Sequence, residues 1–319
     1  MCRKVAIIGA GAIGTTLAYA LALRNRTVDI VLANRDEKKA WAKAFDISHC
    51  LPELPDRSVR SGGIEDCAGA AVVVLTVGVL PRETGTRADV LRDNIEVYRG
   101  IVPRLAELCP SAVFLVVTNP LDAMAYAAYR LALSPRGRVI GSGTALDALR
   151  LRAFTAEAYS LDASRLRIEV VGEHGDSMVP LWSGASYDDR PLPTVLAEAG
   201  TDFNEESRAS LLQRTRRAGW DIRLAGEHST YGIAFSAARI VETLLSAEGG
   251  VLSVSALRDE GEAALDGGRC VYLSLPTRLG REGAAPGGAT ITMDENERAA
   301  LYTSARLVRA QMDAVDTML

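Results

Sequence analysis

The sequence contains three histidines, His49, His174 and His228, and one of them lies in a segment suited to proton transfer. His174 stands in VGEHGDS (residues 171–177), where it follows an apolar run. The flanking glycines let the backbone turn sharply. An imidazole donates and accepts protons readily near neutral pH. A single histidine is more often structural, but this setting favours His174 as an acid/base.

A glycine-rich turn near the N-terminus has the spacing of a dinucleotide-binding loop. Gly9, Gly11 and Gly14 form GAGAIG, which follows an apolar strand and opens a helix. In such a loop the first glycine makes the tight turn, the second admits a pyrophosphate and the third lets helix and strand pack closely. The helix N-terminus then attracts the phosphate charge. The alternative is a turn that binds no ligand, but the repeated strand–helix pattern favours a nucleotide site.

The end of the second apolar strand bears on which nicotinamide cofactor binds. NAD sites commonly have an acidic residue there, which bonds the ribose 2′-hydroxyl. Here the positions are Asn34 and Arg35, and the first carboxylate is Asp36. Asn34 does not repel a 2′-phosphate, and the Arg35 guanidinium matches phosphate oxygens. The pattern favours NADP over NAD, unless Arg35 is only a solvated residue at the helix start and Asn34 holds the ribose of NAD.

Short apolar strands alternate with helices in the first half of the chain. Strands are predicted at 4–8, 28–33, 71–77, 113–117 and 138–140, and helices at 35–50, 88–108 and 121–133. Strands that are apolar on both faces indicate a parallel sheet covered on both sides. Beyond residue 143 the predicted helices are 144–159, 232–245 and 294 onward, and the predicted strands are 166–171, 251–257 and 270–276. We therefore expect two domains, 1–143 and 144–319.

The composition excludes several classes of protein. Hydrophobic residues make up 48% and charged residues 24% of the 319 residues, as in an ordinary globular protein. The net charge of −4, without a basic tract, gives no sign of a nucleic-acid partner. Five cysteines without a CxxC pair predict neither disulfides nor a metal site, and they suit a reducing compartment. The apolar stretch 5–23 is interpreted as a buried strand, turn and helix, so a cytoplasmic protein without membrane contact is expected.

Five motifs occur in order along the chain, and together they are specific. They are GAGAIG at 9–14, TRAD at 86–89, TNP at 118–120, GSGTALDALR at 141–150 and GEHGDS at 172–177. In this order they resemble the lactate/malate dehydrogenase family of 2-hydroxy-acid dehydrogenases, from about Arg3 to the C-terminus. The resemblance implies an α/β fold, with a doubly wound parallel Rossmann sheet and a second α+β substrate domain. It also implies a homodimer or homotetramer.

The resemblance assigns the catalytic roles. His174 resembles the family's acid/base, which protonates the carbonyl oxygen as hydride arrives at carbon. Asp147 resembles its partner carboxylate, which fixes the tautomer and stabilises the charged ring. Arg150 resembles the residue that binds the substrate carboxylate through two parallel hydrogen bonds. Asp147 and Arg150 share one helix face at i, i+3 spacing, and on their own they would be interpreted as an intrahelical salt bridge.

Further positions follow from the same resemblance. Arg87 looks like the mobile-loop arginine that polarises the carbonyl when the loop closes. Asn119 looks like the residue that bonds substrate and positions the nicotinamide, and it follows a strand at its carboxyl end, where α/β sites lie. The expected cofactor-binding residues are Gly9, Gly11, Ala12, Ile13, Gly14, Asn34, Arg35, Thr76, Val77, Gly78, Asn94, Val117 and Asn119.

Two positions depart from the family pattern. The family distinguishes malate from lactate six residues before the loop arginine, with arginine in malate-type and commonly glutamine in lactate-type enzymes, but here the residue is Pro81. Arg82 follows, and a one-residue slip would let it bind a second anionic group; alternatively it points to solvent. In the segment 226–233, Ser229 falls at the usual pocket position. The adjacent His228 adds another cation for the substrate unless it faces outward.

The sequence thus predicts an oxidoreductase that transfers hydride between NAD(P)H and a small 2-oxo acid. A substrate with a second anionic group, such as oxaloacetate, malate or an analogue, is favoured, and a lactate-type enzyme for a monocarboxylic acid is the alternative. An NAD-dependent glycosidase would need metal-binding cysteine and histidine in the second domain, and the GEHGDS and LD-x-x-R motifs argue against it. A non-catalytic nucleotide-binding protein would lack the catalytic set, but His174, Asp147, Arg150 and Arg87 are all present.

Overall fold

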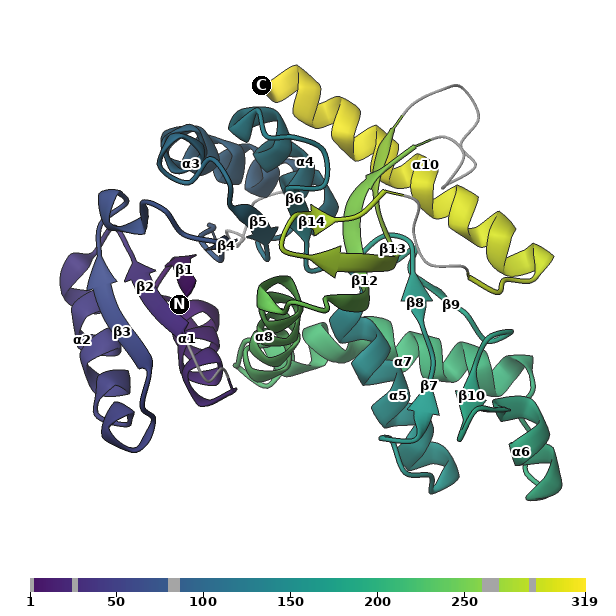
Figure 1. The fold of residues 1–319 in the computed structure, drawn as a ribbon. Helices are drawn as coiled ribbons and strands as arrows, with labels where there is room; N and C mark the ends of the chain where they lie inside the picture. The colour runs from purple at the N-terminus through teal and green to yellow at the C-terminus, as the bar shows by residue number, and fades with distance from the viewer. Residues whose placement is uncertain (1–2, 25–27, 80–86, 260–269, 287–290) are drawn as a thin grey trace.

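Six parallel strands form the centre of the fold, in the computed structural model shown in Figure 1. The structure describes residues 3–24, 28–79, 87–259, 270–286 and 291–319. The strands lie in the order β3-β2-β1-β4-β5-β6. Their bounds are Arg3–Ile8 (β1), Val28–Ala33 (β2), Arg57–Gly62 (β3), Val72–Leu75 (β4), Val113–Val116 (β5) and Val139–Gly141 (β6). Because the strand order reverses between β1 and β4, the sheet is doubly wound, and ligands bind at the carboxyl ends of such strands.

Successive residues of the central strands face two different cores. Val5 and Ile7 of β1 belong to the core beneath α1, α2 and α8, whereas Ala6 and Ile8 belong to the core beneath α3, α4 and α10. The helices concerned are α1 (Ala12–Arg24), α2 (Glu37–Ser48), α3 (Arg87–Leu108), α4 (Leu121–Ala132), α8 (Tyr231–Leu245) and α10 (Glu295–Met318). Both faces are buried, as the continuous apolar strands predict.

Three antiparallel strands from the second half of the chain continue the same sheet. They are β12 (Gly250–Arg258), β13 (Val271–Gly280) and β14 (Gly283–Ala284), and they complete a nine-stranded sheet. β12 joins β6 at a single antiparallel pair, Ser255 opposite Gly141. The C-terminal helix α10 packs against β13 and α4 beside this extension (Figure 1).

The remainder of the second half forms a separate small core. Helices α5 (Ala145–Tyr159), α6 (Leu192–Glu198) and α7 (Glu205–Leu224) enclose the apolar cluster around Leu151 and Ile168. The short strands here are β7 (Leu166–Arg167), β8 (Val170–Val171), β9 (Val179–Pro180), β10 (Ser186–Tyr187) and β11 (Arg190–Pro191). In Figure 1 this region lies below the extended sheet.

The predicted fold class, a doubly wound parallel sheet with a second α+β part, is confirmed, and three local predictions differ. Strand β3 was not predicted, because only Val59 of its six residues is buried. The strands predicted near 166–171 are β7 and β8, which belong to different sheets, since β7 pairs with β10 whereas β8 pairs with β9. Helix α2 begins at Glu37 instead of residue 35, because the Asp36 side chain caps it by accepting a hydrogen bond from the backbone N–H of Lys39. Within the described residues, no helix is long and apolar enough to cross a membrane.

The turn from β1 to α1 is closely packed. Gly9 has φ +117°, in the region that favours glycine, and its N–H donates to the Ala33 carbonyl at 2.7 Å. A Cβ at Gly14 would lie 1.9 Å from the Gly9 carbonyl oxygen. A Cβ at Gly11 would meet no atom within 4 Å. The third glycine of the motif is therefore required for packing, whereas the second leaves an open stretch of backbone.

Alanine substitutions at Gly14 and Gly11 should differ in their effect on stability, because only Gly14 is closely packed. Gly14→Ala should lower the free energy of unfolding by about 3 kcal/mol, since the methyl group collides with backbone that cannot move freely. Gly11→Ala, the matched control, should leave the unfolding free energy of the ligand-free protein within about 0.5 kcal/mol of the wild type. Chemical denaturation measures both, and equal losses in the two variants would contradict the packing role of Gly14.

Candidate active site

His174 lies on a loop that three other parts of the fold hold in place. The loop follows β8, and Gly172 forms an antiparallel bridge with Ser274 of β13. The next backbone N–H, that of Glu173, donates to Ser304 Oγ of α10 at 2.8 Å. The backbone N–H of His174 donates to Asp122 Oδ2 of α4 at 3.0 Å. The backbone that presents the imidazole is thus fixed on successive residues.

The imidazole is oriented by a buried carboxylate. His174 Nδ1 lies 2.6 Å from Oδ2 of Asp147, which is 1% exposed in the first turn of α5. This contact leaves Nε2 for a substrate. Burial by itself lowers the pKa of His174, but the charge and hydrogen bond of Asp147 outweigh it, and the net pKa is raised above the ordinary 6.5. The arrangement therefore suits an imidazolium that donates a proton near neutral pH.

Asp122 is a second buried carboxylate at this site, and sequence reasoning did not single it out. It is 2% exposed, and its Oδ1 accepts a hydrogen bond from Ser255 Oγ at 2.5 Å while its Oδ2 receives the His174 N–H. Burial raises the pKa of Asp122 to about 6, although both hydrogen bonds oppose that rise. Asp122 contacts the backbone of the loop and not the imidazole, so it positions His174. Its place two residues after the TNP motif was the available signal.

Arg150 stands between Asp147 and Ser229. Its Nη1 is 3.5 Å from Asp147 Oδ1, at the limit of a hydrogen bond, and its Nη2 donates to Ser229 Oγ at 2.9 Å. Arg150 therefore does more than form an ion pair within α5, because its guanidinium also connects α5 to the segment before α8. Sequence reasoning placed Ser229 near the substrate, and the structure brings it to Arg150. The neighbouring His228 is exposed, and its backbone carbonyl accepts a hydrogen bond from Thr230.

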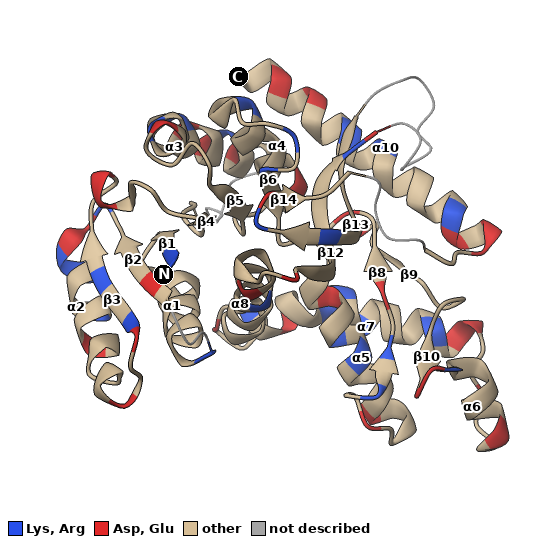
Figure 2. Ribbon diagram, viewed as in Figure 1, with Lys and Arg blue, Asp and Glu red and all other residues tan. Residues whose placement is uncertain are grey.

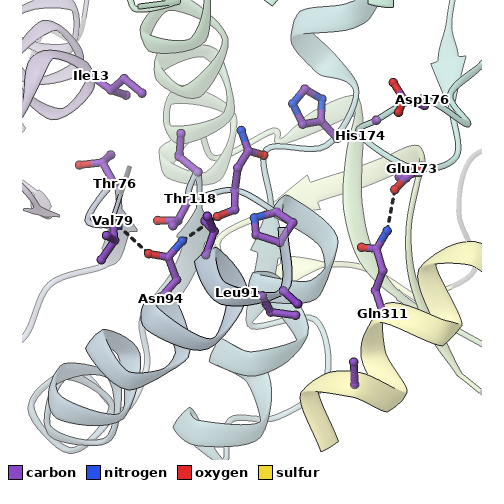
Figure 3. A pocket seen from close by; sticks show the side chains of 18 of the residues that line it. Ile13, Thr76, Val79, Leu91, Asn94, Thr118, Glu173, His174, Asp176 and Gln311 are labelled. Carbon is purple, nitrogen blue, oxygen red and sulfur yellow. Dashed lines mark hydrogen bonds between the residues drawn. The ribbon is translucent and has the colours of Figure 1, made fainter. Parts of the chain in front are cut away.

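Glu173 links the histidine loop to the C-terminal helix. Its Oε1 accepts from Gln311 Nε2 at 2.7 Å, as Figure 3 shows, and its Oε2 accepts from Ser177 Oγ at 2.6 Å. Both carboxylate oxygens are thus engaged by polar side chains. This network makes α10 part of the wall around His174, which the motif alone did not reveal.

A cavity of about 890 Å³ lies in front of His174 (Figure 3). It extends from the glycine-rich turn at Ile13 to α10. Its lining residues are Ile13, Thr76, Gly78, Val79, Ala88, Val90, Leu91, Asn94, Val117, Thr118, Asn119, Pro120, Glu173, His174, Gly175, Asp176, Arg223, Ala310, Gln311 and Ala314. Several predicted cofactor and substrate residues therefore share one cavity with the imidazole.

Asn94 supports the wall of this cavity. It is 1% exposed, its Oδ1 accepts from the Val79 N–H at 2.6 Å, and its Nδ2 donates to the Asn119 carbonyl at 2.8 Å. Figure 3 draws both bonds. Thr76 Oγ1 donates to the carbonyls of Ile8 and Gly9 at 3.1 and 3.2 Å. These buried contacts fix the ends of β1, β4 and β5, where a nicotinamide would lie.

The remaining predicted residues are distributed as follows. Gly9, Gly11, Ala12 and Gly14 form the β1–α1 turn, and Val77 continues from β4. Arg82 lies outside the described residues. Arg87 is the first residue of α3, and its side chain also lies outside the description.

The glycine-rich turn fits the pyrophosphate of a dinucleotide. Helix α1 begins at Ala12, directly after Gly11, whose missing side chain leaves the backbone open. Backbone N–H groups at a helix N-terminus bind phosphate oxygens. Asn34, at the end of β2, accepts a hydrogen bond from the Ala10 N–H at 3.3 Å and so lies beside this turn. The residues present therefore fit a nicotinamide dinucleotide.

The comparisons with known proteins cover the whole chain. Residues 3–141 match the lactate/malate dehydrogenase, NAD binding domain, and residues 144–318 match the lactate/malate dehydrogenase, alpha/beta C-terminal domain. An L-lactate dehydrogenase of Thermus aquaticus is 38% identical over 315 residues, covering 98% of this chain and 99% of the relative. An L-lactate dehydrogenase of Synechococcus sp. (strain JA-3-3Ab) is 35% identical over 312 residues, covering 98% and 99% of the two chains.

Solved structures agree with these matches. MGS-M5, a lactate dehydrogenase enzyme from a Medee basin deep-sea metagenome library, superposes with a TM-score of 0.91 at 30% identity over 99% of both chains. The minor L-lactate dehydrogenase from Enterococcus mundtii, in a ligands-bound form, gives a TM-score of 0.90 at 29% identity over 98% of both chains. None of these matches supports the NAD-dependent glycosidase that was considered as an alternative from the sequence. The resemblance inferred from five motifs is confirmed, and this oxidoreductase belongs to the lactate/malate dehydrogenase family.

Proposed function

We propose that the protein reduces a short 2-oxo acid to the 2-hydroxy acid, with pyruvate as the reference substrate. The proposal depends on one observation, the 2.6 Å contact between His174 Nδ1 and Asp147 Oδ2 beside the Arg150 guanidinium. This contact supports His174 as an oriented proton donor, and the adjacent Arg150 guanidinium is suited to binding a carboxylate. The relatives are named L-lactate dehydrogenase, which supports the monocarboxylic alternative over the dicarboxylic acid that the sequence around Arg82 favoured.

The chain's own residues hold the substrate and move one proton. Arg150 binds the substrate carboxylate through two parallel hydrogen bonds, a geometry that only a guanidinium supplies. His174, as imidazolium, donates its Nε2 proton to the carbonyl oxygen, and Asp147 stabilises the charged ring. Arg87 polarises the same carbonyl, and Asn119 holds substrate and cofactor in register. The nicotinamide cofactor, when bound along the glycine-rich turn and Asn119, supplies the hydride that reaches the carbonyl carbon.

Initial rates of NADH and NADPH oxidation with pyruvate test this function. His174→Asn should reduce kcat by about 10²- to 10⁴-fold while leaving cofactor binding nearly unchanged, because only the proton donor is removed. Equal loss of turnover and of cofactor binding would contradict the role of His174. Absence of turnover by the wild type with any short 2-oxo acid would contradict the proposed function.

The pH profile supplies the control for this assignment. Reduction needs protonated His174, whose pKa is raised above 6.5, so kcat/KM for reduction should fall as pH rises through that raised pKa. Oxidation of the hydroxy acid needs the neutral ring and should change in the opposite direction. Asp147→Asn removes the charge that raises the pKa, so the falling limb for reduction should move to lower pH.

Arg150→Lys tests the binding of the substrate carboxylate. An ammonium cannot reproduce two parallel hydrogen bonds, so KM for the 2-oxo acid should rise about 10- to 100-fold. KM for the cofactor should change little, since Arg150 contacts Asp147 and Ser229 and is not at the glycine-rich turn. Steady-state kinetics in both substrates measure the two constants. An unchanged KM for the 2-oxo acid would show that Arg150 is only structural.

We propose further that the cofactor site accepts NADPH in preference to NADH. The residue beside the turn is Asn34, an amide, and the carboxylate of Asp36 is engaged in capping α2. Arg35 between them is exposed and available to a 2′-phosphate. The support is the charge at these three positions, whereas the family match indicates NAD binding in general.

Asn34→Asp measures this preference. A carboxylate beside the ribose repels a 2′-phosphate, so the ratio of kcat/KM for NADPH to that for NADH should fall at least about 10-fold. Lys38→Gln, which removes an exposed charge in the first turn of α2, is the matched control and should leave the ratio unchanged. The NADPH proposal would be contradicted if the wild type prefers NADH and Asn34→Asp does not change the kcat/KM ratio. That result would not bear on the proposed reduction of a 2-oxo acid.

The assembly and location stay predictions. Family membership supports a homodimer or homotetramer of the 34.0 kDa chain, which a sedimentation-velocity mass would test. The four cysteines that the structure describes are unpaired, which is compatible with the cytoplasmic location expected from the sequence.

A further inference from the structure

The buried carboxylate of Asp122 is an ionisable group that the proposed reaction does not yet use. Asp122 lies in the first turn of α4 and is 2% exposed. Its Oδ2 accepts from the His174 N–H at 3.0 Å, and its Oδ1 accepts from Ser255 Oγ of β12 at 2.5 Å. A neutral amide could accept the same loop hydrogen bond, and burying a charge costs far more free energy than burying an amide. Holding the loop therefore does not by itself account for a carboxylate at this position.

The surroundings of Asp122 keep it ionised in the pH range in which His174 titrates. Burial raises the pKa of the Asp122 carboxyl to about 6, and the charge of Glu173 adds to this rise. The Ser255 hydroxyl, the His174 N–H and the charge of the imidazolium oppose it. The N-terminus of α4 also favours a negative charge in its first turn. Since the pKa of His174 is raised above 6.5, Asp122 loses its proton before the imidazolium does as pH rises.

The charges of Asp122 and His174 affect each other. Burial lowers the pKa of His174, and the positive charge of Arg150 lowers it further. Asp147 raises the pKa of His174 through its charge and its hydrogen bond, and the charge of Asp122 raises it as well. Two carboxylates on two different helices, α5 and α4, thus oppose the burial of the imidazolium and the neighbouring guanidinium.

We propose that ionised Asp122 is a second counter-charge for the His174 imidazolium, so that it stabilises the ring that carries the proton as well as holding the loop backbone. Asp147 bonds to the ring itself, whereas Asp122 acts on the ring through space and bonds to the backbone N–H. Asp122 is a positioning residue, since it is not among the described residues that line the cavity. The inference rests on the acid/base role of His174 in the proposed function, and it makes proton donation depend on two carboxylates instead of one.

The NMR signal of the His174 imidazole tests this inference without any turnover. The chain has three histidines, so comparison with the spectrum of His174→Asn assigns the signal. Asp122→Asn keeps an acceptor for the His174 N–H but removes the charge. The midpoint of the His174 titration should therefore move to lower pH, by about half a pH unit to one pH unit. An unchanged midpoint in Asp122→Asn would overturn the inference.

Glu169→Gln is the matched control for this measurement. The Glu169 carboxylate accepts a hydrogen bond from Ser253 Oγ at 2.5 Å, two residues before Ser255 on the same strand. Glu169 is exposed, so water screens its charge. The variant removes a carboxylate bound to β12, as Asp122→Asn does, and it should leave the His174 midpoint unchanged.

Ser255→Ala gives a second test should Asp122→Asn fail to fold. It keeps the Asp122 carboxylate and removes a hydrogen bond that lowers the pKa of this group. In the wild type, the ionisation of Asp122 should appear as a second inflection of the His174 signal near pH 6. In Ser255→Ala this inflection should move to higher pH. Its absence from the wild type, or an unchanged position in the variant, would overturn the inference.

The pH dependence of reduction is a readout that a merely structural role would not change. On the alkaline side of the His174 limb, kcat/KM for pyruvate should be about 3- to 10-fold lower in Asp122→Asn than in the wild type. Below about pH 6 the two enzymes should converge, because Asp122 is then protonated in the wild type as well. An equal loss at every pH would show that Asp122 only holds the loop, and would overturn the inference. A shifted NMR midpoint in an enzyme that reduces no 2-oxo acid would instead count against the proposed function and support the inference.

Discussion

The contact between His174 and Asp147 is the constraint on which the rest of the site depends. Burial alone would hold the imidazole neutral, and the carboxylate reverses that direction, so that the ring can carry the proton that the carbonyl oxygen needs. The contact is short, 2.6 Å, and joins residues 27 positions apart. Removing one partner of such a buried pair costs about 3–5 kcal/mol, because the other charge is then left uncompensated. The surrounding fold therefore has to hold the two elements, α5 and the loop after β8, in fixed register.

That register is set by backbone contacts from distant parts of the chain. The N–H groups of Glu173 and His174 bind Ser304 of α10 and Asp122 of α4, and Asp122 is itself held by Ser255 of β12. These partners come together because β12 and β13 continue the parallel sheet past β6, and α10 packs against that extension. The antiparallel strands are thus part of the catalytic framework as well as of the fold.

Two kinds of selectivity are located in different parts of the molecule. The residues proposed to select the cofactor, Asn34 and Arg35, follow β2 of the parallel sheet, beside the turn that fits a pyrophosphate. The residues proposed to bind the substrate carboxylate and line its pocket, Arg150 and Ser229, come from α5 and the segment between α7 and α8. Since each set is held by separate contacts, a change in one need not disturb the other.

The sequence by itself determined the reaction class, because glycines, a strand–helix alternation and the HGDS and LD-x-x-R motifs are local patterns that imply local geometry. The doubly wound sheet and the glycine-rich turn were predictable in this way, whereas the pairing of His174 with Asp147 was expected only from the family resemblance. Only the tertiary structure decided what surrounds them. Several features depend on contacts between segments far apart in the chain. They are the division of 166–171 between two sheets, the weakly patterned edge strand β3, the hydrogen bond from the His174 N–H to Asp122, the Glu173–Gln311 hydrogen bond and the position of Arg223 on the cavity wall. Periodicity and spacing contain no information on such contacts, since they arise when helices and strands pack and bury particular faces.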